Sequence, residues 1–432
     1  MGLCYGQSER EDVPPSLRPR LLRSSLIPRP PYAPILVYQS DFIVAISSVL
    51  SYGYGMNTSS STIDVGVIQD DAHWQQLLAR LPDDLEQSVF TCGAILRRRQ
   101  VRSAAQLLRF IFAYACNLPL SVVAGWAAAI GLVHITDQAI GQHIRDASTW
   151  LGTLLTQVLA ARAGLEEAPQ VRFHLVDGSG VTRPGARGTD WRLHLSFDLQ
   201  YGRLTHVELT DAHTAESFER SAPQPGDVMV ADRFFGTRTE VLVAVRAQAN
   251  ALVRIGWQAF PLLTRTGTPF DLFAALRTVP YGQTQEWAVQ MKPLSRQDPV
   301  VLGRLVACRL PETEAALARA RVCKQHRKTA KKNAHGQKAQ LQTATLEAAE
   351  YMLLFTTLSA VTASTLQIVQ LYRFRWQIEL LIKRLKSIMA LDYLTARHTQ
   401  LCRAVLLAKL LLAVLVDDLC ADAEAFSPSH RP

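Results

Sequence analysis

Three acidic residues, far apart in the sequence, occupy positions where carboxylates could gather around a metal ion. Asp177 ends a stretch of alternating apolar residues, Asp232 ends the apolar run Val-Met-Val-Ala, and Glu379 lies on an amphipathic segment near the C-terminus. Three converging carboxylates cannot all stay ionised without cations, and their hard oxygen ligands suit Mg²⁺. Two such ions can activate an attacking oxygen at a phosphate and stabilise the leaving one. The triad therefore predicts metal-dependent phosphoryl transfer.

Each acid taken alone has a plainer interpretation. Asp177-Gly178 is a common turn pair, and Asp232 followed by Arg233 could form an ion pair at the end of a strand. Glu379 could belong to a solvated surface helix. The combination is more specific than its parts, provided that the fold brings the three residues together.

The segment around Glu379 has the periodicity of one amphipathic helix. Its polar residues fall within a roughly 80° stripe at 3.6 residues per turn: Tyr372, Arg375, Glu379, Lys383 and Lys386. The opposite side is apolar: Ile378, Leu381, Ile382 and Leu385. We expect the apolar side to be buried and the polar stripe to face a polyanion.

The elements expected around the first two acids form a recognisable order. Alternating patterns predict strands over 171–175 and 191–199, a third follows over 204–210, and 211–220 could be helical. A buried strand over 227–232, a helix over 237–248 and a strand over 251–255 complete the order βββαβα, which is that of the ribonuclease-H-like fold. Because the first and fourth strands of that sheet are neighbours, Asp177 and Asp232 should project side by side.

The rest of the chain divides around this core. We expect an α+β multidomain protein with a ribonuclease-H-like (βββαβαβα) core over 166–256 and 346–395, interrupted by a β-rich insertion with a basic loop over 257–345. An all-α domain over 63–165 precedes the core, and a C-terminal helical segment over 396–432 follows it. Residues 1–62, rich in proline and arginine, are expected to be a disordered or mis-annotated extension.

The composition limits the partners. The 432 residues carry a formal charge of +9, which favours nucleic acid or another polyanion. Within the helical region, 120–131 followed by 136–155 resembles a helix-turn-helix, with Thr136 as the N-cap, although helical hairpins are common in any all-α domain. The longest apolar run, 404–416, is interrupted by Lys409 and is too short to span a bilayer, so no membrane segment is expected.

The spacing of the polar stripe also carries a family resemblance. Tyr372, Arg375, Glu379 and Lys386 reproduce a Tyr-x2-Arg-x3-Glu-x6-Lys signature at every position, and the chain resembles bacterial insertion-sequence transposases of the DDE class that bear this signature. Further similar segments are Asp177-Gly-Ser, Asp190-Trp-Arg-Leu-His and Ala231-Asp-Arg. The resemblance covers roughly 63–415.

The resemblance implies a function and roles for particular residues. Asp177, Asp232 and Glu379 would be the catalytic metal ligands for two Mg²⁺ ions, with Mn²⁺ as a substitute. Residues expected to contact DNA are Tyr372, Arg375, Lys386, Lys383, Trp376, Arg233 and Arg254, together with Trp257 or Trp287 as a stacking partner for a flipped base. The protein would bind double-stranded DNA, both the terminal inverted repeats and the target, as a homodimer in a synaptic complex. It would work in the bacterial cytoplasm at the nucleoid.

Two other functions stay open from the sequence. One is a catalytically silent, transposase-derived repressor or architectural DNA-binding protein, against which the intact acids argue. The other is a stand-alone nuclease, which would cleave DNA without joining it to a target.

Overall fold

The structure is a computed structural model that describes residues 71–163, 171–332, 341–391, 394 and 396–425. The extension expected over 1–62 lies outside the described residues. Among the described residues the protein is a mixed α/β structure, in which helices pack on a large mixed sheet.

The N-terminal region is helical. Its elements are α3 (Asp71–Leu78), α4 (Leu85–Thr91), α5 (Ala104–Ala115), α6 (Leu120–Ala129), α7 (Asp137–Asp146) and α8 (Ser148–Ala163). Thr136 caps α7 as expected, because its hydroxyl accepts from the Ala139 N–H at 3.2 Å. The single helix expected over 136–155 is instead two, since α7 ends at Asp146 and α8 begins at Ser148.

Nine strands form one sheet within the described residues. The five strands that carry the two aspartates are β1 (Arg172–Val181), β2 (Trp191–Asp198), β3 (Arg203–Asp211), β4 (Asp227–Ala231) and β5 (Asn250–Arg254). The sheet order is β3-β2-β1-β4-β5-β9-β8-β7-β6, with β1, β4 and β5 parallel to one another and β2 and β3 antiparallel to their neighbours. Helix α9 (Arg238–Arg246) connects β4 to β5.

The helix expected between the third and fourth strands is absent from the structure. Residues 212–217 form turns and irregular backbone, and only the 3₁₀ helix η1 (Phe218–Ser221) follows them. Side-chain hydrogen bonds explain this, because the Asp211 carboxylate accepts from the N–H groups of His213 and Thr214 and so holds a local turn.

The residues after β5 extend the same sheet. They form β6 (Leu262–Thr264), α10 (Leu272–Arg277), β7 (Thr284–Met291), β8 (Val301–Arg309), α11 (Glu312–Lys332) and α12 (Thr343–Ala348). Strand β9 (Tyr351–Thr356) then lies between β8 and β5. Much of the basic loop expected within 257–345 is the helix α11.

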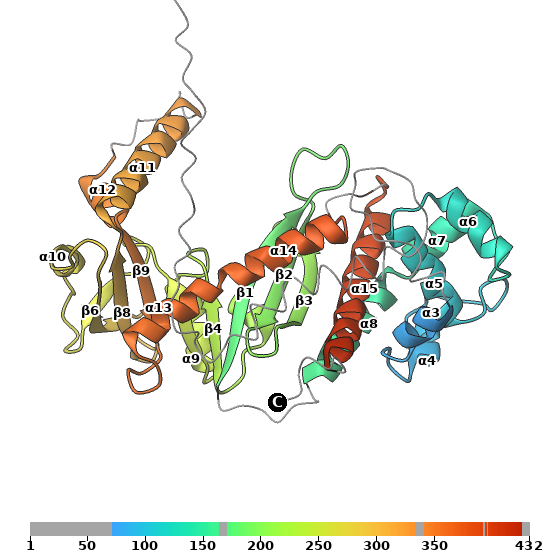
Figure 1. Ribbon diagram of the computed structural model, residues 1–432, viewed down its shortest axis with the longest axis horizontal. Helices are drawn as coiled ribbons and strands as arrows, with labels where there is room; N and C mark the ends of the chain where they lie inside the picture. Colours follow the sequence, from blue (N-terminus) through green and yellow to red (C-terminus); the bar gives the residue numbers. More distant parts are fainter. Residues whose placement is uncertain (1–70, 164–170, 333–340, 392–393, 395, 426–432) are drawn as a thin grey trace, which may run out of the picture. The chain divides into compact units, whose positions relative to one another are not determined.

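The segment that carries Glu379 is two helices rather than one. Helix α13 (Thr365–Phe374) packs against β5 and β7, and α14 (Trp376–Ile388) lies across β1 (Figure 1). They meet at Arg375, where Arg375 N donates to Tyr372 O at 3.1 Å and Ile378 N donates to Arg375 O at 3.3 Å. These are the tighter bonds of a 3₁₀ turn, which are frequent at functional hinges.

The two faces of the sheet belong to separate apolar clusters. Leu175 and Val230 pack with the helices α5, α8, α14 and α15 (Thr399–Ala425), while Val176 and Ala231 pack with α9 on the other side. This alternation follows from the two-residue period of a strand. Helix α15 is long and apolar enough to cross a membrane, yet 72% of its most apolar window is buried inside the protein, against α8 and α5 among others. It reads as a core helix.

Lys409 is a buried charge in the middle of α15. Its side chain is fully buried, and its ammonium donates to Asn117 Oδ1 at 3.0 Å and to Ala390 O at 2.8 Å. Asn117 follows α5, and Ala390 follows the last turn of α14 with a φ of 46°. One ammonium thus links the N-terminal helices and the C-terminal helix to the end of the helix that carries Glu379. Burial lowers the pKa of Lys409 to about 8.

We predict that the stability of the protein relative to Lys409→Met rises with pH. The unfolded state holds the Lys409 proton more tightly than the folded state, so the folded wild type gains stability as pH rises from about 8 towards 10.5. The gain should be about 2 kcal/mol between pH 7 and 9.5, measured by chemical denaturation. Lys292→Met, at an exposed lysine, is the control and should show no such trend.

Candidate active site

The register of β1 against β4 brings the two aspartates to the same level. Val176 lies opposite Ala231 in this parallel pair, so Asp177 and Asp232 are the next residues along. Leu175 and Val230 belong to the apolar cluster that also contains residues of α14. Because residues two apart on a strand face the same way, Asp177 and Asp232 point to the face of the sheet that α14 covers. Each carboxylate accepts a local N–H: Asp177 from Gly178 at 2.8 Å and Asp232 from Phe234 at 2.7 Å.

The surroundings of Asp177 oppose its ionisation. Burial raises the pKa of its carboxyl to about 6; the Gly178 N–H opposes that shift, the Asp232 charge adds to it, Arg375 opposes it and Glu216 adds to it. The ionised form of Asp177 is therefore unfavourable in the metal-free protein. A divalent cation would relieve the repulsion, so the aspartate pair fits a hard cation.

Glu379 lies on a helix that packs on the strand of Asp177, but its carboxylate is already paired with an arginine. It lies in the first turn of α14, and Arg375 Nη2 donates to its Oε1 at 2.7 Å in an i, i+4 ion pair. Within the described residues, no three His, Cys, Asp or Glu side chains are grouped to hold a metal ion. Glu379 therefore does not fit a three-carboxylate site in this conformation.

Tyr372 lies in the core, contrary to the expectation that it belongs to an exposed stripe. Its side chain is buried in the same cluster as Ile368, because α13 turns this face toward the sheet. Burial raises the pKa of its hydroxyl. The Arg375 guanidinium lies 5.7 Å from the centre of its ring, and Arg375 Nε is buried without a hydrogen-bond partner among the described residues. The buried Tyr372 ring therefore packs against the Arg375 guanidinium.

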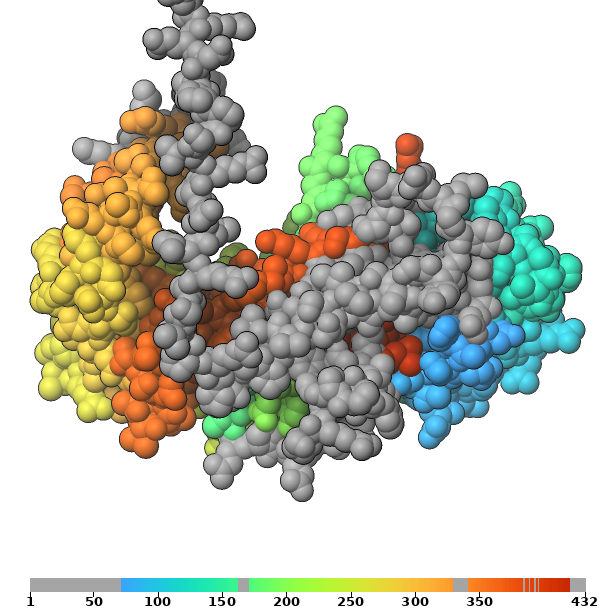
Figure 2. Space-filling view, viewed as in Figure 1, coloured from blue at the N-terminus to red at the C-terminus, as the bar shows by residue number. Residues whose placement is uncertain are grey.

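The other cations of the predicted DNA surface lie around this point. Lys386 Nζ donates to Gly180 O at 3.3 Å and so ties the end of α14 to β1. Lys383, Arg233 and Arg254 are exposed. Trp376, at the start of α14, keeps 42% of its surface exposed. Figure 2 shows α13 and α14, in orange, reaching the molecular surface.

The two tryptophans considered for base stacking are both used in packing here. Trp257 is half-buried and lies 5.3 Å from the Phe273 ring, while Trp287 is half-buried in β7 and lies 6.3 Å from the Phe270 ring. Both belong to the cluster on the α9 side of the sheet.

Glu216 is an acid near the aspartates that the sequence analysis missed. It lies in the irregular segment before η1, and Arg192 Nη1 donates to its Oε1 at 2.9 Å. The sequence analysis placed Glu216 on an expected helix over 211–220, which gave no reason to bring it close to Asp177. The available signal was Gly178 itself, a residue without a side chain directly after Asp177.

We predict that Asp177→Asn stabilises the metal-free protein at pH 7.5 by about 1–3 kcal/mol. The folded state binds the Asp177 proton more tightly than the unfolded state, so the stabilisation present near pH 4 is lost as pH rises through about 6. The difference between variant and wild type should therefore vanish at pH 4. Urea denaturation at both pH values measures it.

Asp227→Asn is the matched control, with the opposite sign. Burial opposes ionisation of Asp227, but hydrogen bonds from His174 and Gln224 N, with the charges of His174 and Arg172, hold its pKa below the usual range. Its replacement should lower stability at pH 7.5. A loss of stability in both variants would contradict the repulsion argued for Asp177.

Comparison with known proteins identifies the family of this chain. The family described as Transposase DDE domain matches residues 172–415. InsL of Escherichia coli K12, the transposase assigned to insertion sequence element IS186A, is 35% identical over 366 residues, which are 82% of this chain and 96% of InsL. The transposase of element IS421 from Escherichia coli is 35% identical over 367 residues, with the same coverage. A piggyBac transposase synaptic complex with hairpin DNA aligns over 90% of this chain and 78% of its own at 9% identity, with a TM-score of only 0.34. Members of the matched family act on DNA and use divalent metal ions, and this chain belongs to the DDE transposase family.

Proposed function

We propose that this protein is the transposase of a bacterial insertion sequence, which binds terminal inverted repeats, cleaves at the element's ends and joins the freed 3′-OH to target DNA. The observation that carries this is the alignment of Asp177 with Asp232 on the face of the sheet across which α14 brings Glu379. Water attacks the phosphodiester first and the freed 3′-OH attacks the target second, without a covalent protein–DNA intermediate. Both steps need the same in-line arrangement at phosphorus.

The core is a ribonuclease-H-like domain in this proposal. Support comes from the order β3-β2-β1-β4-β5, with an antiparallel β1-β2-β3 meander and with α9 between two parallel strands. We keep the division into a helical N-terminal domain over 63–165, a core over 166–256 and 346–395, an insertion over 257–345 and a C-terminal segment over 396–432. The insertion would be joined to the core through β9 and β5, which pair directly.

Asp177, Asp232 and Glu379 would hold two Mg²⁺ ions, or Mn²⁺ in their place. When bound, the ions activate the attacking oxygen and neutralise charge at the phosphate. The aspartates suit this role in the present conformation, whereas Glu379 becomes available only when Arg375 leaves it. A phosphate of the bound DNA is the natural competitor, because a guanidinium binds phosphate and carboxylate through the same fork of N–H groups. DNA binding would thus release the third carboxylate.

The DNA surface would surround α14. Lys383, Arg233, Arg254 and Trp376 are exposed and free to meet a phosphate backbone or a sugar, and Lys386 lies at the far end of the same helix. Tyr372 would act by holding Arg375. Trp257 or Trp287 would take part in stacking only after leaving its aromatic partner.

End recognition would fall to the N-terminal helices. Helices α6 and α7 pack together, and α7 exposes Gln138 and Gln142. We propose that a homodimer holds two ends of double-stranded DNA in a synaptic complex, in the bacterial cytoplasm at the nucleoid. A catalytically silent repressor is the alternative, and the same cleavage assay excludes it when wild-type protein cuts the ends.

Replacing the acids should separate cleavage from binding. Asp177→Asn, Asp232→Asn and Glu379→Gln should each reduce end cleavage with Mg²⁺ by at least about 10³-fold, because a hard-cation site loses a charged ligand. Binding of end DNA, measured by gel shift without metal, should stay within about threefold. Glu347→Gln is the control and should cleave normally, because Glu347 lies on α12 and pairs with Arg277. Retained cleavage in any of the three would overturn the assignment of that residue.

Replacing Arg375 should strengthen cation binding by the free protein. Arg375→Gln removes a positive charge from Asp177 and releases Glu379, so Mn²⁺ should bind about threefold to tenfold more tightly in the absence of DNA, as measured by calorimetry. Arg373→Gln, two residues earlier and exposed, should leave the affinity unchanged. If Arg375 is only a DNA ligand, both variants will bind Mn²⁺ like the wild type.

A further inference from the structure

The carboxylate of Glu216 occupies the place where residue 178 would carry a side chain. A Cβ built on Gly178 would lie 2.5 Å from both Cδ and Oε1 of Glu216, and the three atoms nearest to it all belong to that residue. Gly178 therefore leaves room for an acid directly beside the backbone of Asp177. Because neighbouring residues of a strand face opposite ways, Glu216 lies on the other side of β1 from the Asp177 carboxylate.

Arg192 fixes the Glu216 carboxylate at this place. It lies on β2 opposite Gly180, and its Nη1 donates to Glu216 Oε1 at 2.9 Å. The Glu216 side chain is only 13% exposed, compared with 27% for Arg192. A carboxylate so little exposed is kept in one position by its ion pair.

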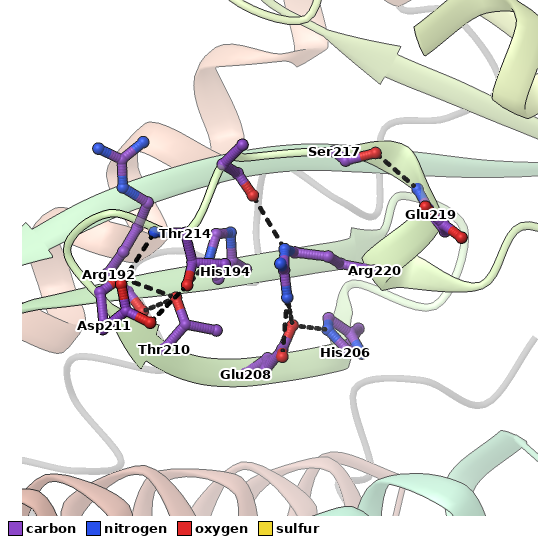
Figure 3. Close-up of polar contacts among 11 residues, drawn as sticks. Arg192, His194, His206, Glu208, Thr210, Asp211, Thr214, Ser217, Glu219 and Arg220 are labelled. Atoms are coloured by element: carbon purple, nitrogen blue, oxygen red, sulfur yellow. Dashed lines mark hydrogen bonds and ion pairs between the residues drawn. The ribbon is translucent and has the colours of Figure 1, made fainter. Parts of the chain in front are cut away.

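Hydrogen bonds and an ion pair hold the segment that carries Glu216 against β3, an edge strand of the sheet (Figure 3). On its N-terminal side, the Asp211 carboxylate accepts from His213 N at 2.8 Å and from Thr214 N at 3.1 Å. On its C-terminal side, Arg220 donates to Ala215 O at 2.9 Å and pairs with Glu208 on β3, also at 2.9 Å. These bonds bracket Glu216 without involving it.

A second anchor joins this segment to the residues after Asp232. Ser217 Oγ and Phe218 N donate to Glu240 Oε2 on α9, at 3.0 and 2.6 Å. The Phe218 ring is buried and stacks on Phe235 at 5.2 Å between ring centres. Phe235 comes three residues after Asp232. The position of Glu216 is thus tied to that of Asp232.

Glu216 and the aspartates also act on one another electrostatically. Burial raises the pKa of Glu216; Arg192 opposes that shift and the Asp232 charge adds to it. The Glu216 charge in turn is one of those that raise the pKa of Asp177. The proximity inferred from packing and anchoring is therefore matched by electrostatic interactions of Glu216 with the aspartates.

We propose that Glu216 is a positioning residue of the active site, whose carboxylate, held by Arg192 in the space left by Gly178, strengthens the negative field at Asp177 and Asp232 and so raises their affinity for a divalent cation. This rests on the proposed function, in which the two aspartates hold that cation. Glu216 itself needs no contact with the cation or with DNA. Its effect should appear in cation affinity and not in the rate at saturating cation.

The test compares Glu216→Gln with a matched variant of the same scaffold. Glu347→Gln also removes a carboxylate paired with an arginine, but on α12, outside the bonds that hold the Glu216 segment. Titration of the full-length protein with Mn²⁺ in a calorimeter should show affinity reduced about threefold to tenfold in Glu216→Gln and changed less than twofold in Glu347→Gln. The Mg²⁺ concentration for half-maximal end cleavage should rise by the same factor, and the maximal rate should be recovered at high Mg²⁺.

Gly178→Ala gives an independent test that keeps the glutamate. Its methyl group collides with the Glu216 carboxylate, so it should reduce Mn²⁺ affinity by itself and add little in a Glu216→Ala background. Thermal melting of each variant shows whether it is folded. Additive losses in the double variant would contradict the proposal.

The outcomes separate this proposal from the one it rests on. If Asp177→Asn binds Mn²⁺ like the wild type and cleaves DNA, the proposed active site is wrong. If Asp177→Asn loses both properties while Glu216→Gln behaves like Glu347→Gln, the active site stands and Glu216 is only a structural partner of Arg192. A loss of maximal rate in Glu216→Gln that excess Mg²⁺ does not restore would also overturn the positioning role.

Discussion

The parallel pairing of β1 with β4 is the constraint on which the site depends. Backbone hydrogen bonds set Val176 opposite Ala231, and the next residue along the chain is an aspartate in both cases. A slip of one residue would turn one of the carboxylates to the opposite face. The hydrophobic pattern prevents that slip, because Leu175 and Val230 must face one cluster while Val176 and Ala231 face the other. The core thus enforces a repulsion between like charges that the free side chains would avoid.

The neighbouring charges show what this edge of the sheet lacks. Glu379 is paired with Arg375 and Glu216 with Arg192. Among the described residues, Asp177 and Asp232 form no ion pair within 4.0 Å and accept only local N–H groups. Two acids with arginine partners therefore flank two without. The missing positive charge is the property expected of a site that binds cations, and its cost is local instability in their absence.

The sequence predicts this core well where patterns are long and alternating. Strands near Asp177 and Asp232 follow from apolar periodicity, although β1 runs on to Val181 and so places Asp177 inside the strand and not at its end. Thr136 follows from its capping chemistry. The prediction of a helix over 211–220 was wrong. The Asp211 carboxylate accepts hydrogen bonds from the backbone N–H groups of His213 and Thr214, and these bonds hold a turn instead. Glu216 was missed with it. The burial of Tyr372 was missed because helical periodicity assigns residues to a face but not to a neighbour, and only the packing of α13 on the sheet decides what that face meets.

The break at Arg375 gives the spacing of the signature a physical meaning. From Tyr372 to Arg375 the chain makes a 3₁₀ turn, closed by the Arg375 N to Tyr372 O bond, which lays the guanidinium over the buried ring. From Arg375 to Glu379 it makes one α-helical turn, and the two side chains pair. From Glu379 to Lys386 it makes two further turns, which bring the ammonium to the carbonyl of Gly180 on the strand of Asp177. The gaps of two, three and six residues are therefore one tight turn and three ordinary ones. In the proposed function, Tyr372 and Lys386 would hold the two ends of this segment in place while Arg375 exchanges the Glu379 carboxylate for a phosphate.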